Sequence, residues 1–190
     1  AEPHPGHHMR IETLPHPTID SGAPYARCVG LLLLATDLNS EADLRRMFPQ
    51  DVGLFVNRLH HRNPMDLAAL RRVADDVPRA GADILPGLAL DATVFGCTSG
   101  TIAAGENAML AHLKACCHTR HATTPVTASL AALAALGARR VSILTPYEDA
   151  VNRALGEYYA SRGLEVLNVS GLGLDDDYRM TAITPEDIVA

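Results

Sequence analysis

The chain has 190 residues, a net charge of −6 with histidine taken as neutral, and 47% hydrophobic residues, of which few are aromatic and none is tryptophan. An acidic chain lacks the basic face that general nucleic-acid binding needs, and no apolar run is long enough to span a bilayer. We therefore expect a globular protein with a core of alanine, leucine and valine, and neither a nucleic-acid nor a membrane partner.

Four cysteines, Cys28, Cys97, Cys116 and Cys117, are present, and no secretion signal precedes them. This pattern favours a cytoplasmic protein with reduced thiols.

Residues 1–26 are rich in proline and histidine, including His4, His7, His8 and His16. A histidine-rich tract can bind metal, but a flexible arm has the same composition. We favour the flexible arm and predict no metal site.

From residue 27 onward, apolar runs that suit buried parallel strands alternate with helical patterns. We expect strands at 27–36, 52–59, 93–96, 141–145 and 164–169, and helices at 41–48, 64–80, 102–113, 126–136 and 148–162. Ser40 and Asn63 are expected as N-caps, and Gly81, Gly137 and Gly163 as helix ends. A last helix is expected to begin at Thr184, and a polar loop is expected over 171–179.

This alternation predicts an α/β fold with parallel sheets, in which ligands bind at the carboxyl ends of the strands. Similar strand–turn patterns near the start of the chain and near Val141 suggest two lobes. We place the first αβα lobe at 27–122 and the second at 123–190. Because a helix starts at the last residues, we expect the second lobe to be truncated in this chain.

Cys97 ends a short strand and precedes a helix, in the run Val94-Phe95-Gly96-Cys97-Thr98-Ser99-Gly100. Exposed amides at a helix N-terminus favour an anion or a thiolate. The motif therefore predicts a catalytic thiol. The alternative is a buried structural cysteine at a strand end.

A second group of histidines and cysteines occupies 112–121, with Cys116 and Cys117 at its centre. Its spacing does not match a recognised zinc motif. We expect the end of a helix followed by a polar loop.

The Val94–Gly100 motif resembles the first catalytic-cysteine motif of the aspartate/glutamate racemase superfamily. The run from Thr124-Pro125 to Leu144-Thr145-Pro146-Tyr147 is similar to the maleate cis–trans isomerase and arylmalonate decarboxylase branch, and within it to the isomerase-like proteins of ectoine utilisation. The resemblance extends over roughly 27–190. It implies two pseudo-symmetric αβα lobes and a homo-oligomeric isomerase or racemase without cofactor or metal. Such an enzyme acts on a small carboxylate or dicarboxylate through a cysteine thiolate, here in ectoine catabolism.

The resemblance also implies site residues: Cys97 as the catalytic thiol, and Asn39 and Tyr147 as carboxylate ligands. The amides and hydroxyls of Thr98 and Ser99 are further candidates for substrate binding. Each has an alternative: Tyr147 as a packed strand-end residue, Asn39 as a turn residue, and Thr98 and Ser99 as helix caps.

The family has an asparagine where this chain has Asp176 and Asp177. A carboxylate there would repel a dianion, so maleate is disfavoured as substrate. The second family cysteine is expected beyond residue 190, and neither Cys116 nor Cys117 is assigned to its role. Two alternatives therefore stay open: a non-catalytic carboxylate-binding protein of the same fold, and a decarboxylase of the same superfamily.

Overall fold

The computed structural model describes residues 11–15 and 24–189. The histidines predicted in the N-terminal arm lie outside these described residues. Within them the strands are β1 (Arg27–Leu34), β2 (Val52–Leu59), β3 (Leu90–Phe95), β4 (Thr119–Thr123), β5 (Arg140–Tyr147) and β6 (Glu165–Leu174). The first four form one parallel sheet in the order β2-β1-β3-β4, and β5 and β6 form a second parallel sheet.

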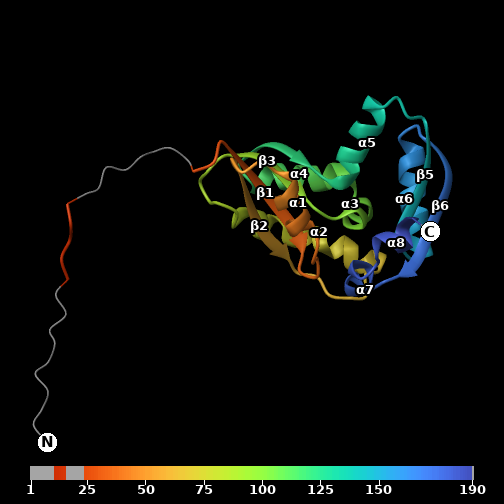
Figure 1. The fold of residues 1–190 in the computed structure, drawn as a ribbon, viewed down its shortest axis with the longest axis horizontal. Helices are drawn as coiled ribbons and strands as arrows, with labels where there is room; N and C mark the ends of the chain where they lie inside the picture. The colour runs from red at the N-terminus through yellow and green to blue at the C-terminus, as the bar shows by residue number, and fades with distance from the viewer. Residues whose placement is uncertain (1–10, 16–23, 190) are drawn as a thin grey trace, which may run out of the picture.

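The helices are α1 (Ser40–Met47), α2 (Leu67–Ala82), α3 (Thr98–Ala104), α4 (Glu106–Cys116), α5 (Pro125–Ala135), α6 (Asp149–Ser161), α7 (Asp177–Thr181) and α8 (Pro185–Val189). Figure 1 shows α1, α2 and α4 around the larger sheet, and α6 beside the smaller one. We propose that the two lobes meet near Pro125, where α5 follows the last strand of the larger sheet.

The side chains of β1 alternate between two cores, as expected for a strand buried on both faces. Leu32 and Leu34 belong to the larger cluster, which includes apolar residues of α2, α3 and α4. Leu31 and Leu33 belong to a smaller cluster with residues of α1. This burial anchors the strand whose carboxyl end carries the loop to α1.

Several predicted boundaries are confirmed. The strands β1, β2 and β5 match the expected runs closely. Gly137 and Gly163 follow α5 and α6 at positive φ, as glycine after a helix end should. Thr184 caps α8, because its hydroxyl oxygen accepts the N–H of Asp187 at 3.2 Å.

The two predicted N-caps are wrong. Ser40 is the first residue of α1, and the Asp37 carboxylate accepts its N–H at 2.9 Å. The second expected helix starts at Leu67, because the Asp66 carboxylate caps it by accepting the Ala69 N–H at 2.6 Å. A carboxylate therefore performs the capping in both places.

The single helix predicted over 102–113 is two helices. Gly105 separates α3 from α4 with a φ of 89°, a conformation that glycine adopts without strain. Gly81 does not end its helix but lies inside α2. A glycine alone therefore does not distinguish a helix end from a break or a close contact.

Two expected loops are partly regular structure. Thr119–Thr123, placed in the polar loop of 112–121, forms strand β4 beside β3. The region of 171–179 holds the end of β6 and the start of α7.

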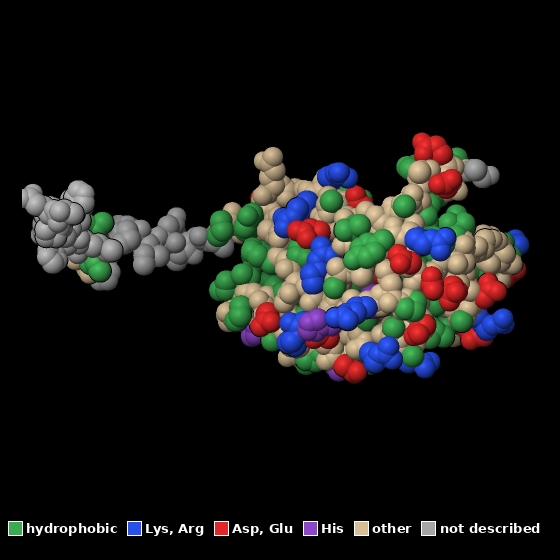
Figure 2. All heavy atoms as spheres, turned by 90° about the horizontal axis from the view of Figure 1, so that it is seen from below, with side chains coloured by type: hydrophobic (Ala, Val, Ile, Leu, Met, Phe, Trp, Pro, Cys, Tyr) green, Lys and Arg blue, Asp and Glu red, His purple; other side chains and the backbone are tan. Residues whose placement is uncertain are grey.

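Among the described residues, no helix is both long and apolar enough to cross a membrane. On the face shown in Figure 2, acidic and basic side chains are interspersed.

Candidate active site

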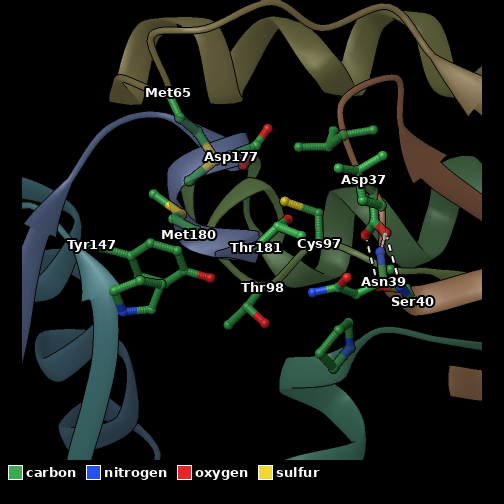
Figure 3. A pocket seen from close by; sticks show the side chains of 15 residues that line it. Asp37, Asn39, Ser40, Met65, Cys97, Thr98, Tyr147, Asp177, Met180 and Thr181 are labelled. Carbon is green, nitrogen blue, oxygen red and sulfur yellow. Dashed lines mark hydrogen bonds between the residues drawn. The ribbon is translucent and has the colours of Figure 1, made fainter. Parts of the chain in front are cut away.

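A cavity of about 340 Å³ lies at the carboxyl ends of β1 and β3 (Figure 3). Loops that follow these strands form one part of its wall, and the end of β5 and helix α7 form another. Met65, before α2, and Pro125, at the start of α5, complete it. Four of the five predicted site residues line it: Asn39, Cys97, Thr98 and Tyr147. They come from both sheets, so the cavity lies where the two sheets approach each other.

Cys97 occupies the N-cap position of α3, two residues after β3 ends. Its sulfur accepts the Gly100 N–H at 3.2 Å and lies 3.5 Å from the Ser99 hydroxyl. Cys97 is only 8% exposed, and it forms part of the cavity wall. The strand–thiol–helix pattern thus places the sulfur beside one helix amide and beside the cavity.

The surroundings of Cys97 keep its thiol protonated. Burial raises the pKa of Cys97, and the nearby carboxylates of Asp177 and Asp37 raise it further. The hydrogen bonds from Ser99 and the Gly100 N–H lower this pKa, but they do not offset burial. The helix amide therefore acts as the sequence suggested, yet its effect is outweighed.

Tyr147 lies at the end of β5 and points across the cavity toward the Cys97 side (Figure 3). Burial raises the pKa of Tyr147, so its hydroxyl stays a hydrogen-bond donor at neutral pH. Its backbone is held by Asn152, whose side-chain amide donates to the Tyr147 carbonyl at 2.8 Å. Gly171 makes room for this contact, because a Cβ there would stand 2.1 Å from Asn152 Nδ2.

The loop after β1 presents Asn39 to the cavity. Its side chain makes no capping hydrogen bond to α1. The turn is made by Asp37, whose carboxylate accepts the N–H groups of Asn39 and Ser40 at 3.1 and 2.9 Å. Asn39 is thus left facing the cavity, with its amide directed toward the centre in Figure 3.

Ser99 is not part of the cavity wall. It is 1% exposed, and its hydroxyl lies between Cys97 Sγ and Met65 Sδ, to which it donates at 3.9 Å. We therefore propose that Ser99 acts on the thiol rather than on the substrate.

Helix α7 brings Asp177 into the cavity wall. Asp176 caps α7 by accepting the N–H groups of Tyr178 and Arg179, and it does not line the cavity. The Asp177 carboxylate accepts the Thr36 hydroxyl, and the Asp177 N–H donates to Asn63 Oδ1 at 3.1 Å. The structure thus distinguishes two adjacent aspartates that the sequence left equivalent.

His61 lies behind Asp177. Its Nε2 is 3.5 Å from Asp177 Oδ2, and its side chain is 2% exposed. Burial lowers the pKa of His61, although the Asp177 charge opposes this. No local sequence pattern predicts this contact, because Thr36, His61 and Asp177 come from three separate segments.

No group of three or more histidine, cysteine, aspartate and glutamate side chains is arranged to hold a metal ion within the described ranges. The histidines and cysteines of 112–121 are described residues, and they form no such group.

The fold is similar to those of several solved structures. The maleate isomerase from Pseudomonas putida S16 matches with a TM-score of 0.74 and 19% identity, over 85% of this chain and 70% of that chain. The Nocardia farcinica maleate cis–trans isomerase bound to TRIS gives 0.69 and 20%, over 86% and 70%. An unliganded arylmalonate decarboxylase gives 0.64 and 22%, over 86% and 69%. These values confirm the expected two-lobed α/β fold.

Among curated proteins, none matches this chain at a significant level. The model of one family, arylmalonate decarboxylase, matches residues 68–190, a span that includes Cys97, Tyr147 and Asp177. This match and the shared fold place the protein within the superfamily that its cysteine motif suggested. The chain belongs to the arylmalonate decarboxylase family.

Proposed function

We propose that the protein is a cofactor-independent enzyme that uses the Cys97 thiol to isomerise or racemise a small carboxylate. The observation that carries this proposal is the position of Cys97 on the wall of a cavity shared with Asn39, Thr98 and Tyr147. A nucleophilic sulfur and three neutral hydrogen-bonding side chains suit a carboxylate held beside a reacting carbon.

The neutral side chains have a catalytic role in this proposal. When the reaction moves an electron pair toward the substrate carboxylate, the Tyr147 hydroxyl and the Asn39 amide stabilise the added negative charge. Donors fixed by the fold act most strongly where charge develops in a site from which water is excluded. The buried Asn152 supports this geometry because it holds the backbone of Tyr147.

Of the two routes, addition and elimination needs one thiol. The S–H bond of Cys97 and the π bond of the alkene break as a carbon–sulfur bond forms at one carbon and a carbon–hydrogen bond forms at the other. The remaining carbon–carbon single bond rotates, and elimination then restores the double bond and the thiol. A cysteine-to-serine mutant of the Nocardia farcinica maleate cis–trans isomerase carries a covalently bound succinylcysteine intermediate, which supports this route. Racemisation needs a second proton-transfer group on the opposite face. We favour isomerisation, because its addition and elimination steps can both be assigned to Cys97.

Two aspartates in the cavity wall, Asp37 and Asp177, disfavour substrates that carry two negative charges. Asp37 and Asp177 both line the wall and both raise the pKa of Cys97. A dianionic substrate would add repulsion and disfavour the thiolate further. We therefore infer a substrate that places no second carboxylate near Asp177. Maleate is accordingly expected to be a poor substrate.

The second candidate is a decarboxylase, favoured by the family match over residues 68–190. In that reaction Cys97 would return a proton to the carbon that loses carbon dioxide, a role for which a protonated thiol is suited. A role in ectoine catabolism, a cytoplasmic location and a homo-oligomeric state remain predictions.

The test compares the parent protein with Cys97→Ser and with Cys28→Ser, a control at a cysteine outside the cavity. The substrates are maleamate, in which an amide replaces one carboxylate of maleate, together with maleate, phenylmalonate and aspartate. The readouts are the product isomer, released carbon dioxide and loss of chirality. We expect Cys97→Ser to lower kcat/KM by at least about a hundredfold, or about 2.7 kcal/mol in the barrier, and Cys28→Ser to have little effect.

Each outcome separates the candidates. Carbon dioxide release from phenylmalonate alone would favour the decarboxylase. Full turnover by Cys97→Ser would show that the thiol mechanism is wrong. Carboxylate binding by calorimetry without any turnover in the parent protein would identify a binding protein instead of an enzyme.

A further inference from the structure

Cys116 and Cys117 form a close pair of thiols far from the cavity. Their sulfur atoms are 3.6 Å apart, well beyond the length of a disulfide, which is about 2.05 Å. Cys116 is the last residue of α4, and Cys117 leaves the helix with an extended backbone, φ −104° and ψ 129°. This change of direction turns two adjacent side chains toward each other.

A glycine of α2 makes room for both thiols. A Cβ at Gly81 would stand 2.3 Å from Cys116 Sγ and 2.8 Å from Cys117 Sγ. Glycine inside a helix costs about 0.5–1 kcal/mol relative to alanine, and here it lets the helix backbone lie against two sulfur atoms. Cys116 also donates to the Val77 carbonyl of the same helix at 3.5 Å. The pair is therefore held in place by packing with α2.

The pair borders a separate cavity of about 520 Å³, which is also lined by Lys114, His118 and Arg120. Cys116 is half-buried, and Cys117 is 3% exposed. The hydrogen bond between the two thiols lowers the pKa of Cys117 and raises that of Cys116. One sulfur of the pair is thus prepared to react first, with the other directly beside it.

We propose that Cys116 and Cys117 are a vicinal dithiol site that captures a thiophilic agent through both sulfurs, with trivalent organoarsenicals as the ligand class. Trivalent arsenic is pyramidal, with bond angles at or below tetrahedral, so two bonds of about 2.3 Å, the length of a zinc–thiolate bond, hold the sulfurs about 3.3–3.8 Å apart. The observed 3.6 Å suits such a bridge. A metal needing three or four protein ligands does not fit, because the described residues supply no such group here.

The reaction is a condensation without redox change. An arsenic–oxygen double bond and two sulfur–hydrogen bonds break, two arsenic–sulfur bonds form, and both protons leave with the oxygen as one water. Arsenic stays trivalent, and neither sulfur is oxidised.

The test uses phenylarsine oxide on the reduced, full-length protein, followed by intact mass spectrometry. We expect one adduct, heavier by phenylarsine oxide less one water, that survives excess monothiol and is removed by ethanedithiol. Cys116→Ser and Cys117→Ser should each bind at least about a hundredfold more weakly, because the second bond to one arsenic is intramolecular. Cys28→Ser should bind as the parent does.

A variant-free measurement guards against misfolded variants. After arsenical treatment of the parent protein, iodoacetamide labelling and peptide mapping should find Cys116 and Cys117 protected together. An adduct that a monothiol removes, or protection of only one of the two cysteines, would overturn the proposal. Loss of two hydrogens in place of an arsenical adduct would identify a disulfide-forming pair and would likewise contradict it.

Discussion

Cys97 and the Cys116–Cys117 pair lie near opposite ends of β3, and different neighbours shift the pKa values of their thiols. Cys97 follows the carboxyl end of the strand, where burial, Asp177 and Asp37 raise its pKa. The pair lies near the amino end, where the Leu90 N–H donates to the His118 carbonyl at 2.7 Å. Six residues at about 3.3 Å each put the two ends on the order of 20 Å apart.

The comparison shows that a cysteine's chemistry is set by its neighbours rather than by its own helix. Both sites border a helix end and a cavity. The N-terminal amide at Cys97 does not overcome desolvation and two carboxylates. At Cys117, the hydrogen bond with the Cys116 thiol lowers the pKa. The same residue type is thus arranged for substrate chemistry at one end and, as we propose, for chelation at the other.

The largest expected effect is a separation of the two sites by substitution. The double variant Cys116→Ser/Cys117→Ser should keep kcat/KM within about twofold of the parent, because neither residue lines the catalytic cavity, whereas Cys97→Ser should lose at least about a hundredfold. Phenylarsine oxide binding should show the reverse pattern. If the double variant lost turnover while its circular dichroism and thermal unfolding matched the parent, the two sites would not be independent.

Gly81→Ala should disturb the dithiol end. The added methyl would overlap both sulfurs, so we expect the free energy of unfolding to fall by about 1–3 kcal/mol despite better helix propensity. Arsenical binding should weaken as well. Gly156→Ala in α6 is the matched control, because its Cβ would meet only Val169 Cγ2, at 3.1 Å. Urea unfolding of both variants measures the difference, and equal effects would mean that Gly81 has no special packing role.

The pH dependence of alkylation should rank the thiols. A lowered pKa gives Cys117 its thiolate at a lower pH, whereas a raised pKa delays thiolate formation at Cys97. Because the exposed fraction differs, 3% for Cys117 and 8% for Cys97, the quantity to compare is the pH at which each labelling rate rises, and iodoacetamide labelling of Cys117 should rise at the lower pH. Peptide mapping between about pH 6 and about pH 9, around the ordinary thiol pKa of about 8.5, gives both profiles. Earlier labelling of Cys97 would reverse the proposed electrostatic difference.

The smallest expected effect comes from removing one charge beside Cys97. Asp177→Asn keeps an acceptor for the Thr36 hydroxyl but removes the negative charge, so the pKa of Cys97 should fall and its alkylation should speed up by about two- to tenfold. Asp176→Asn is the control, since Asp176 caps α7 outside the cavity wall. An unchanged labelling rate in Asp177→Asn would remove Asp177 from the account of the thiol.

The fold was predictable where the hydrophobic pattern is strong. The strands β1, β2 and β5 match their apolar runs, because a continuous apolar run is a clear signal for a strand. The expected burial of β5 is wrong, since Thr145 is its one buried residue. Strand β4, with the sequence Thr-Arg-His-Ala-Thr, was missed. It lies at the edge of the larger sheet, where a strand needs few apolar side chains. Helix α7 was missed because it is only five residues long.

The candidate site was predictable in part for the same reason. Four predicted residues line one cavity, since strand ends and helix starts are local features of the sequence. Asp37 was not assigned to that wall, and the sequence did not tell which of Asp176 and Asp177 lies beside the substrate. Asp37 makes the turn before α1, and Asp177 contacts Thr36 across 141 residues of sequence. No pattern within one segment reports such a contact.

By itself, the sequence determined that Cys97 ends a strand and begins a helix, because backbone preferences act over a few residues. Only the tertiary structure decided what that position means. It brings Tyr147 and Asp177 around the sulfur, and it sets Gly81 beside Cys116 and Cys117. Desolvation and charge interactions depend on which distant segments pack together. The location of each thiol is therefore local information, whereas its pKa and its partners are properties of the fold.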